Sequence, residues 1–279
     1  MDDVAVAPTG TASSSPAPAH PPVIARTLPT THVLLPAYNE AASLPSLFER
    51  LSALGAACGE HMTVWVVDDG SSDGTGEIAR QGHALLDVRV VSHPVNLGLG
   101  QAVHSGLCAV LTAADDNDVV VVMDADDTHD VGLVPVLRRA VTEGADLAIA
   151  SRFVPGGEDA TAPTFRRVLS RGAATLFRAS LPLDGVADFT SGYRAYRVGL
   201  LKRATGHYGE RLIEERGFAC MVELLLKLRH CHPVIVEVPL VLRYDRKQGA
   251  SKLRLGRTMM QYLKLLVRDR LAPPPFRRL

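Results

Sequence analysis

Pairs of carboxylates follow hydrophobic runs at two places in the first half of the sequence. Asp124 and Asp126 follow a run of four valines and a methionine, and Asp68 and Asp69 follow the run Thr63–Val67. Two carboxylates separated by one residue at a strand end can direct oxygen ligands at one hard cation such as Mg²⁺ or Mn²⁺. Such an ion can offset the charge on a leaving diphosphate. We therefore interpret Asp124 and Asp126 as a candidate metal site; an acidic loop without a ligand is the alternative.

Asp68 and Asp69 open a segment rich in glycine and serine. Its first carboxylates could accept hydrogen bonds from a nucleobase or a ribose, while Ser72 or Asp73 caps the following helix. Turn and capping chemistry alone would also explain the segment, because its glycines allow the backbone dihedrals that turns require. Taken alone, the segment leaves both interpretations open.

Short apolar runs alternate with helical patterns through the first half of the chain. Val-rich runs without polar alternation are typical of parallel strands covered on both faces, and their alternation with helices predicts a doubly wound α/β domain. Ligands of such sheets bind at the carboxyl ends of the strands, where both acidic pairs would lie. The predicted strands are His32–Leu35, Thr63–Val67, Val88–Val91, Val119–Met123 and Ala145–Ala150, and the predicted helices cover residues 40–54, 73–82, 99–113 and 131–142.

The second half has a less regular pattern. We expect helices over Thr164–Ala179 and Glu215–Arg229, extended structure over Val234–Tyr244 and a final helix over Lys252–Leu271. The final helix is amphipathic, which is typical of a helix in a membrane interface; packing of its apolar stripe on the domain is the alternative. Its polar stripe comprises Arg254, Arg257, Gln261, Lys264 and Arg268, and its apolar stripe comprises Leu255, Met259, Leu263 and Leu266.

The formal net charge of zero hides an asymmetry between the two halves of the 279 residues. Residues 1–130 hold 17 acidic and four basic side chains, whereas residues 131–279 hold 13 acidic and 26 basic side chains. An acidic half suits cations, and a basic half suits phosphates or an anionic membrane surface. Two solvated surfaces of opposite sign are the alternative. No nucleic-acid recognition module is evident, so we expect no nucleic-acid partner.

In their order along the chain, the motifs resemble those of family 2 glycosyltransferases of the GT-A fold, and most of all the dolichol-phosphate mannosyltransferase group. The resemblance covers about residues 31–265 and implies an α/β fold with a Rossmann-like, mostly parallel central sheet, flanking helices and a C-terminal amphipathic helix. The matching segments are Leu34–Glu40, Val66–Thr75, Asn96–Gly100, Met123–Asp126, Ser151–Phe153, Phe165–Arg171, Thr190–Arg194, Val222–Leu225 and Gly249–Lys252.

The resemblance implies roles for individual residues. Asp124 and Asp126 would bind the Mg²⁺ or Mn²⁺ ion, and Asp126 and Arg152 would be catalytic. Arg246 and Lys252 would close over the donor diphosphate, whose oxygens suit guanidinium and ammonium groups. The full set expected to bind the nucleotide-sugar comprises Pro36, Tyr38, Glu40, Val67, Asp69, Asp124, Ala125, Asp126, Arg152, Arg246 and Lys252.

The acceptor implied by the resemblance is a polyprenyl phosphate. Its phosphate would be bound by Arg167, Ser170, Arg171 and Arg194, although a solvated basic helix face would also explain the clustered arginines. A phosphate is already ionised near neutral pH, so its oxygen could attack the anomeric carbon without a strong general base. With a hydroxyl acceptor a base would be needed, and the candidates are Asp188 and Glu223.

The implied activity is inverting transfer of mannose from GDP-mannose to a polyprenyl, dolichol-like phosphate. The alternative is a family 2 transferase that uses a UDP-sugar with undecaprenyl phosphate or a soluble hydroxyl acceptor. The sequence departs from the mannosyltransferase pattern at Thr128, where Gln is frequent, at Ala250, where Glu is frequent, and at Cys220–Met221, where Phe–Gln is frequent. These departures concern the donor sugar and the metal geometry.

The predicted domain organisation is simple. Residues 1–28, rich in Ala, Pro, Ser and Thr, are expected to form a disordered tail, and residues 272–279 a short basic tail. Residues 29–271 would form one domain, with a nucleotide-binding part at about 31–153 and an acceptor-side part at about 154–271. The sequence contains no signal peptide and no apolar run near the roughly 20 residues that span a bilayer. We therefore expect a cytoplasmic protein, peripheral on the cytoplasmic face of the membrane.

Overall fold

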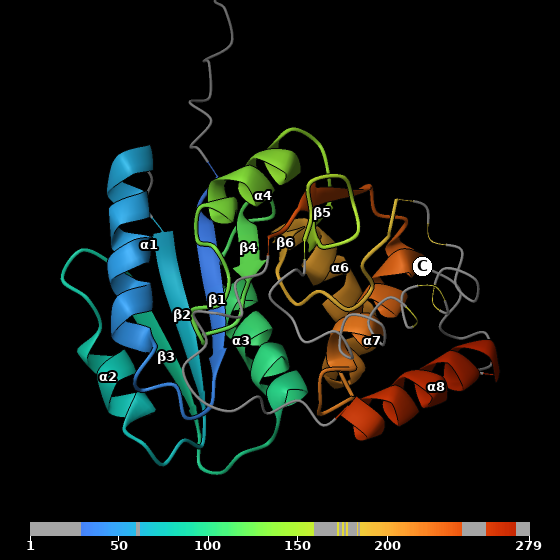
Figure 1. The fold of residues 1–279 in the computed structure, drawn as a ribbon, viewed down its shortest axis with the longest axis horizontal. Coiled ribbons are helices and arrows are strands. Elements are labelled where there is room, and N and C mark those ends of the chain that lie inside the picture. The colour runs from blue at the N-terminus through green and yellow to red at the C-terminus, as the bar shows by residue number, and fades with distance from the viewer. Residues whose placement is uncertain are drawn as a thin grey trace, which may run out of the picture.

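The computed structural model describes residues 29–59, 62–158, 172, 175, 177, 183, 185–241 and 255–271. These residues form one sheet with helices on both faces (Figure 1). The strands are β1 (Thr31–Ala37), β2 (Met62–Asp69), β3 (Asp87–His93), β4 (Val119–Val122), β5 (Leu147–Ser151), β6 (Arg194–Arg197) and β7 (Ile235–Pro239). The helices are α1 (Leu44–Cys58), α2 (Thr75–Gln81), α3 (Leu99–Ala113), α4 (Leu133–Thr142), α6 (Val198–Tyr208), α7 (Cys220–Leu228) and α8 (Leu255–Leu271).

The strand order across the sheet is β3-β2-β1-β4-β6-β5-β7. Neighbouring strands are parallel except at β6, which runs antiparallel between β4 and β5. The mostly parallel sheet expected from the Val-rich runs is therefore confirmed. As a result, the carboxyl ends of the parallel strands and the first residue of β6 lie at the same edge of the sheet.

Two hydrophobic clusters cover the two faces of the sheet. Leu34 packs in one cluster with residues of α3, α6, α7 and α8, whereas Val33 and Leu35 pack in the other with residues of α1 and α4. Adjacent side chains of β1 thus enter opposite clusters, as the alternation along a strand requires. Helix α8 packs on α7, at one end of the molecule (Figure 1).

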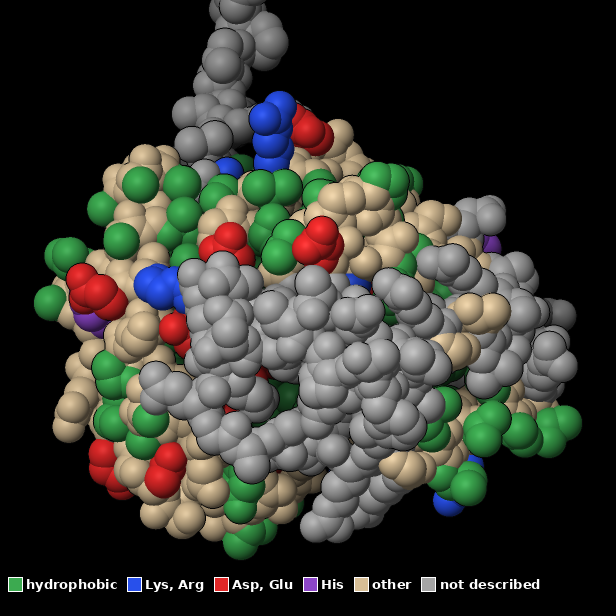
Figure 2. All heavy atoms as spheres, viewed as in Figure 1, with side chains coloured by type: hydrophobic (Ala, Val, Ile, Leu, Met, Phe, Trp, Pro, Cys, Tyr) green, Lys and Arg blue, Asp and Glu red, His purple; other side chains and the backbone are tan. Residues whose placement is uncertain are grey.

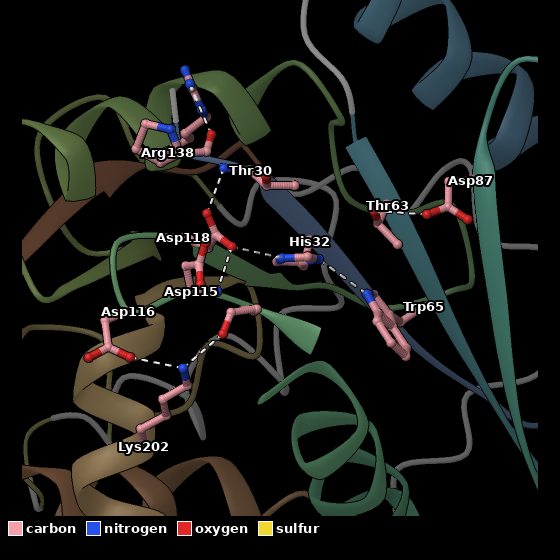
Figure 3. Close-up of polar contacts among 12 residues, drawn as sticks. Thr30, His32, Thr63, Trp65, Asp87, Asp115, Asp116, Asp118, Arg138 and Lys202 are labelled. Carbon is pink, nitrogen blue, oxygen red and sulfur yellow. Dashed lines mark hydrogen bonds and ion pairs between the residues drawn. The ribbon is translucent and has the colours of Figure 1, made fainter. Parts of the chain in front are cut away.

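A buried polar cluster joins the strands at the amino edge of the sheet, opposite the acidic pairs (Figure 3). The Asp118 carboxylate accepts the backbone N–H groups of Thr30 and Asp115, each at 2.8 Å, and lies 3.5 Å from Nε2 of His32. The indole Nε1 of Trp65 donates to Nδ1 of His32 at 3.3 Å. Burial lowers the pKa of His32 in spite of Asp118, so the neutral imidazole is favoured in the folded protein.

The second half differs from the sequence prediction in several elements. Strand β6 and helix α6 were not predicted, and α7 begins at Cys220 instead of Glu215. The extended segment expected from Val234 is present as β7. Most of the helix expected over Thr164–Ala179 lies outside the described residues, among which Gly172, Thr175 and Phe177 are helical.

Candidate active site

The carboxyl edge of the sheet brings the chemically active segments together. In the strand register, Ala37 at the end of β1 pairs with Asp68 near the end of β2. Across β4 and β5, Arg194 pairs with both Val122 and Ile149, so the loops after β4 and β5 flank the segment before β6. The polar residues that follow each strand therefore surround one site, as expected for a sheet of this kind.

Asp124 and Asp126 lie in the loop after β4. The side chain of Asp124 is 42% exposed, and its backbone N–H donates to Nδ1 of His129 at 3.1 Å. Asp126 is buried, and its Oδ1 accepts the Thr128 hydroxyl at 2.6 Å and the Thr128 N–H at 3.2 Å. His129 stacks on the Tyr193 ring with centroids 4.8 Å apart. Local contacts thus position both residues: the Asp124 carboxylate is accessible, and the Asp126 carboxylate is buried and oriented by Thr128.

This loop has the oxygen donors that a hard divalent cation prefers. Asp124 and Asp126 supply carboxylate oxygens, and the Thr128 hydroxyl fixes the orientation of Asp126. Within the described parts of the chain, no group of three or more His, Cys, Asp or Glu side chains is arranged to hold a metal. An ion bound by two carboxylates takes its other ligands from water and substrate phosphate, and the exposure of Asp124 leaves the site accessible to both.

The loops after β1 and β2 are bonded to each other. Asn39 has a left-handed φ of 52°, its N–H donates to Oγ of Ser71 at 3.0 Å, and its Oδ1 accepts the N–H of Ser72 at 2.9 Å. The N–H of Glu40 donates to the Thr75 hydroxyl at 2.8 Å. The expected cap by Ser72 or Asp73 is wrong, because Gly74 is the N-cap of α2 and no side chain caps it. Asp73 Oδ1 instead accepts the N–H of Thr75, at 3.0 Å. The bonds between the two loops still fix the segment expected to bind a nucleoside.

Asp69 has an extended set of partners at the end of β2. It accepts the backbone N–H groups of Leu97 at 2.9 Å and Gly98 at 2.8 Å, and it lies 2.7 Å from Nδ1 of His93. Nε2 of His93 lies 3.0 Å from the Ser105 hydroxyl on α3. Asp69 thus fixes the loop between β3 and α3 at the site. The resemblance implied only contact with the donor.

Arg152, which follows β5, is held in a two-point ion pair with Asp188. Its Nε and one NH2 group each lie 2.8 Å from an Asp188 oxygen, and the same NH2 donates to the Thr190 hydroxyl at 2.7 Å. Asp188 is fully buried, and Glu237 accepts its N–H at 2.8 Å. Burial alone would raise the pKa of Asp188, but the Arg152 charge and the hydrogen bonds lower it overall, so Asp188 stays ionised.

The comparisons with known proteins identify the family. Residues 32–204 match the family described as Glycosyl transferase family 2. The chain belongs to the family 2 glycosyltransferases. This glycosyltransferase is 37% identical over 235 residues to a polyprenol monophosphomannose synthase from Mycolicibacterium smegmatis, covering 83% of this chain and 84% of that one.

A dolichol-phosphate mannosyltransferase from Pyrococcus furiosus is 34% identical over 237 residues, which cover 85% of this chain and 62% of that protein. The glycosyltransferase thus spans less than two thirds of that relative's length. Among solved structures, a glucosyl-3-phosphoglycerate synthase from Mycobacterium tuberculosis, crystallised with Mn²⁺, UDP and phosphoglyceric acid, matches with a TM-score of 0.65 and 25% identity over 88% of this chain and 80% of that chain. The GT-A fold is confirmed by these neighbours, and the same synthase has also been crystallised with Mg²⁺ and UDP.

Of the residues expected in the donor site, two can reach a donor only through their backbone. The side chains of Val67 and Ala125 are buried in the two hydrophobic clusters, so a donor would meet their backbone atoms. Pro36 is partly buried and Tyr38 is exposed at the end of β1. Arg246 and Lys252 lie outside the described residues, as do Arg167, Ser170 and Arg171.

Arg194 is placed differently from the expectation. Its side chain is fully buried, and its two NH groups donate to the carbonyls of Met221 and Phe189, each at 2.7 Å. These contacts join β6 to α7 and to the segment before β6. Arg194 therefore serves the interior of the glycosyltransferase, and we do not carry it into a proposed acceptor site.

Sequence reasoning missed several residues that support the site. His93 contacts Asp69 and His129 contacts Asp124, both of which lie in identified motifs, whereas Ser105 acts through His93 and Glu237 through Asp188. The only available signal was position, because His93 and His129 follow shortly after predicted strands. Asp188 was singled out as a candidate base, but its contacts make it the partner of Arg152.

Proposed function

We propose that this glycosyltransferase moves a mannosyl group from GDP-mannose to a polyprenyl phosphate, with inversion at the anomeric carbon. The observation that carries the proposal is the Asp124–Asp126 pair at the carboxyl edge, oriented by Thr128 and His129. The mannose and the lipid phosphate are supported by relatives named polyprenol monophosphomannose synthase and dolichol-phosphate mannosyltransferase. The metal is supported by neighbours crystallised with Mn²⁺ or Mg²⁺.

Asp124 and Asp126 would hold the Mg²⁺ or Mn²⁺ ion, which when bound would offset the charge on the departing diphosphate. Tyr38, Glu40 and Asp69 would contact the nucleoside. Tyr38 and Glu40 follow β1 and Asp69 is the last residue of β2, so the three lie at the same edge of the sheet. Other contacts would come from Pro36, Val67, Ala125, Arg152, Arg246 and Lys252. The Asp188 carboxylate would orient Arg152 toward the sugar-diphosphate region, because it fixes two nitrogens of the guanidinium.

The acceptor phosphate would be the nucleophile, bound by Arg167, Ser170 and Arg171. Its ionised oxygen needs no base, and catalysis would rest on positioning and on stabilisation of the leaving group. The contacts of the two carboxylates considered as candidate bases support this mechanism. Asp188 pairs with Arg152, and Glu223 is buried against Lys227 and Arg268. Neither is available to deprotonate a hydroxyl acceptor in this arrangement.

Helix α8 would bring the enzyme to the cytoplasmic face of a membrane, where the acceptor lies. It exposes Met260, Leu263, Val267 and Leu271 along one stripe, while Tyr262, Leu265 and Leu266 pack inward. In Figure 2, hydrophobic side chains gather at the lower right, where α8 lies in Figure 1. Lys264 and Arg268 flank this stripe, and a basic, amphipathic helix of this type binds anionic lipid surfaces. Among the described residues, no helix is long and apolar enough to cross a bilayer.

A UDP-sugar donor is the second candidate, favoured by the UDP bound to the structural neighbour. The test is transfer of radiolabelled sugar to a short-chain polyprenyl phosphate from GDP-mannose, UDP-glucose and UDP-GlcNAc in parallel, each with Mn²⁺ or Mg²⁺. We expect label in the organic phase from GDP-mannose only. Label from a UDP-sugar alone would contradict the proposed donor and keep the reaction class.

A further inference from the structure

Glu223 on α7 is a buried carboxylate that binds the backbone of a preceding segment. Its Oε2 accepts the N–H of Glu214 at 2.9 Å and the N–H of Glu215 at 2.7 Å. A carboxylate that accepts backbone N–H groups away from water fixes them strongly, because leaving them unpaired would be costly. Glu223 thus fixes the backbone of residues 214 and 215 against the start of α7.

The other oxygen of Glu223 reaches the surface helix α8. Oε1 pairs with Lys227 at 2.9 Å and with Arg268 at 2.5 Å. The Arg268 side chain is 44% exposed, whereas that of Glu223 is 1% exposed, so the ion pair extends from the surface to the interior. The same carboxylate therefore joins α8 to the 214–216 segment.

Residues 215–216 lie directly against the start of α3. The Arg216 carbonyl accepts the N–H of Gly100 at 3.0 Å. A Cβ atom on Gly100 would lie 1.8 Å from the Glu215 oxygen, and one on Gly98 would lie 2.6 Å from the Arg216 oxygen. The backbone of residues 215–216 contacts the backbone of residues 98–100 directly, without side chains between them. A displacement of the 214–216 segment must therefore move residues 98–100.

Residues 97–98 are in turn bonded to Asp69, the proposed nucleoside contact, through the N–H groups of Leu97 and Gly98. On the other side of the loop, a Cβ atom on Gly70 would lie 2.3 Å from the backbone carbon of Val95. The chain of contacts is therefore continuous from α8 through Glu223 and the 214–216 segment to the end of β2.

We propose that Glu223 is a positioning residue through which α8 sets the conformation of the 94–100 loop and thereby the affinity of the donor site. The effect on donor affinity rests on the proposed function, since Asp69 contacts the nucleoside only in that proposal.

The test compares Arg268→Gln with Arg229→Gln in the full chain without vesicles. Arg229 forms the other described ion pair between the α7 end and α8, at 2.7 Å from Asp269, but it contacts neither Glu223 nor residues 214–216. We expect Arg268→Gln to weaken GDP binding by about fivefold in calorimetric titration, a typical size for coupling between sites. Arg229→Gln should leave the GDP Kd unchanged although it also removes an α7–α8 contact. Equal effects of the two variants, or none from Arg268→Gln, would overturn the proposal.

Hydrogen exchange separates this inference from the identity of the donor. In Arg268→Gln, amides of residues 94–100 and 214–217 should exchange faster than in the wild type, whereas in Arg229→Gln they should not. This readout requires no nucleotide. If the wild type binds no GDP but the two variants differ in exchange as described, the proposed donor is contradicted and the coupling is supported. Unchanged exchange of both segments in Arg268→Gln would contradict the coupling.

Discussion

The acidic residues at the carboxyl edge of the sheet differ in their partners, and the partners indicate which of them are suited to a cation. Asp69 and Asp188 are buried and surrounded by N–H groups or by a guanidinium. Asp124 is the exposed member of the pair after β4, and Asp126 is oriented beside it by Thr128. Among these four carboxylates, the pair after β4 is therefore the one suited to a cation and a substrate phosphate.

Replacement of Asp126 by Asn tests this assignment. We expect transfer to fall by roughly a hundredfold or more, because the amide loses the charge that a divalent ion requires. The thermal midpoint should change little, since Asn can still accept the hydrogen bonds from Thr128. The matched control is Asp127→Asn: Asp127 is next to the pair but binds Arg50 and has a φ of 57°, which Asn tolerates. Equal loss of activity in the two variants would contradict the metal assignment.

Replacement of Asp188 by Asn tests the ion pair with Arg152. Removing one partner of a buried pair leaves the other charge uncompensated, and we expect about 3–5 kcal/mol lower free energy of unfolding at pH 7. Urea unfolding measures this loss. Asp116→Asn is the control, because the Asp116–Lys202 pair is mostly exposed and should change stability by less than about 0.5 kcal/mol. Similar stability of the two variants would show that the Arg152 contact contributes little.

At the scale of elements, α8 presents apolar residues to two sides. Tyr262, Leu265 and Leu266 are buried, whereas Met260, Leu263, Val267 and Leu271 are 56%, 46%, 55% and 76% exposed. The sequence prediction placed Leu263 and Leu266 on the same apolar stripe, but in the structure Leu266 is buried whereas Leu263 is exposed, so the boundary of the packed face lies between them. Packing on the domain is thus confirmed for the buried side, and contact of the exposed side with lipid stays a proposal.

The double substitution Leu263→Glu and Val267→Glu tests the exposed stripe. We expect partitioning onto vesicles with anionic lipids to fall by at least about tenfold, since burial of one such side chain contributes about 1.5–3 kcal/mol. Cosedimentation with the vesicles measures this. Leu85→Glu serves as control, because Leu85 is 76% exposed but lies between α2 and β3. Undiminished vesicle binding by the double variant would exclude this stripe as the lipid contact.

Prediction from sequence succeeded for elements with strong periodicity and failed where tertiary contacts decided. Helix α3 spans Leu99–Ala113 as predicted, and the five Val- or Ala-rich strands are present. β6 is four residues with an arginine at each end, and burial of Arg194 in the core contradicts what its charge suggests. Helix α7 begins at Cys220 rather than Glu215, and the N–H groups of Glu214 and Glu215 before it bind the Glu223 side chain, a tertiary contact that periodicity does not reveal.

The candidate site was predictable in part for the same reason. Asp124 and Asp126 follow a strand that sequence reveals, and the carboxyl-edge rule for α/β sheets then gives their place. Their supports are distant in sequence: Asp188 is 36 residues from Arg152, and Arg268 is 45 from Glu223. No local pattern links such partners, so Asp188 and Glu223 looked like candidate bases until their contacts were known.

At the scale of the whole molecule, the sheet carries the site at one edge and the buried His32 cluster at the other (Figure 3). Because the folded-state pKa of His32 is lowered, the unfolded chain binds more protons as the pH falls below about 6.5. The free energy of unfolding therefore decreases as the pH falls from that value to the folded-state pKa, by at most about 1.4 kcal/mol per pH unit.

Between pH 7.5 and 5.5, the free energy of unfolding of the variant His32→Gln should fall less than that of the wild type. Urea unfolding followed by circular dichroism at the two pH values measures both slopes. His83→Gln is the control, since His83 pairs with the exposed Glu49 outside this cluster. Equal pH dependence of the wild type and His32→Gln would mean that His32 contributes nothing to acid sensitivity.

In the proposed reaction a lipid phosphate, already ionised, attacks the anomeric carbon of the sugar without a general base. The most direct measurement compares transfer of radiolabelled mannose from GDP-mannose to a short-chain polyprenyl phosphate and to the corresponding polyprenol, with Mn²⁺ or Mg²⁺ present. We predict label in the organic phase with the phosphate and none above background with the alcohol. Comparable transfer to the alcohol, or no label in lipid from either acceptor, would contradict the claim.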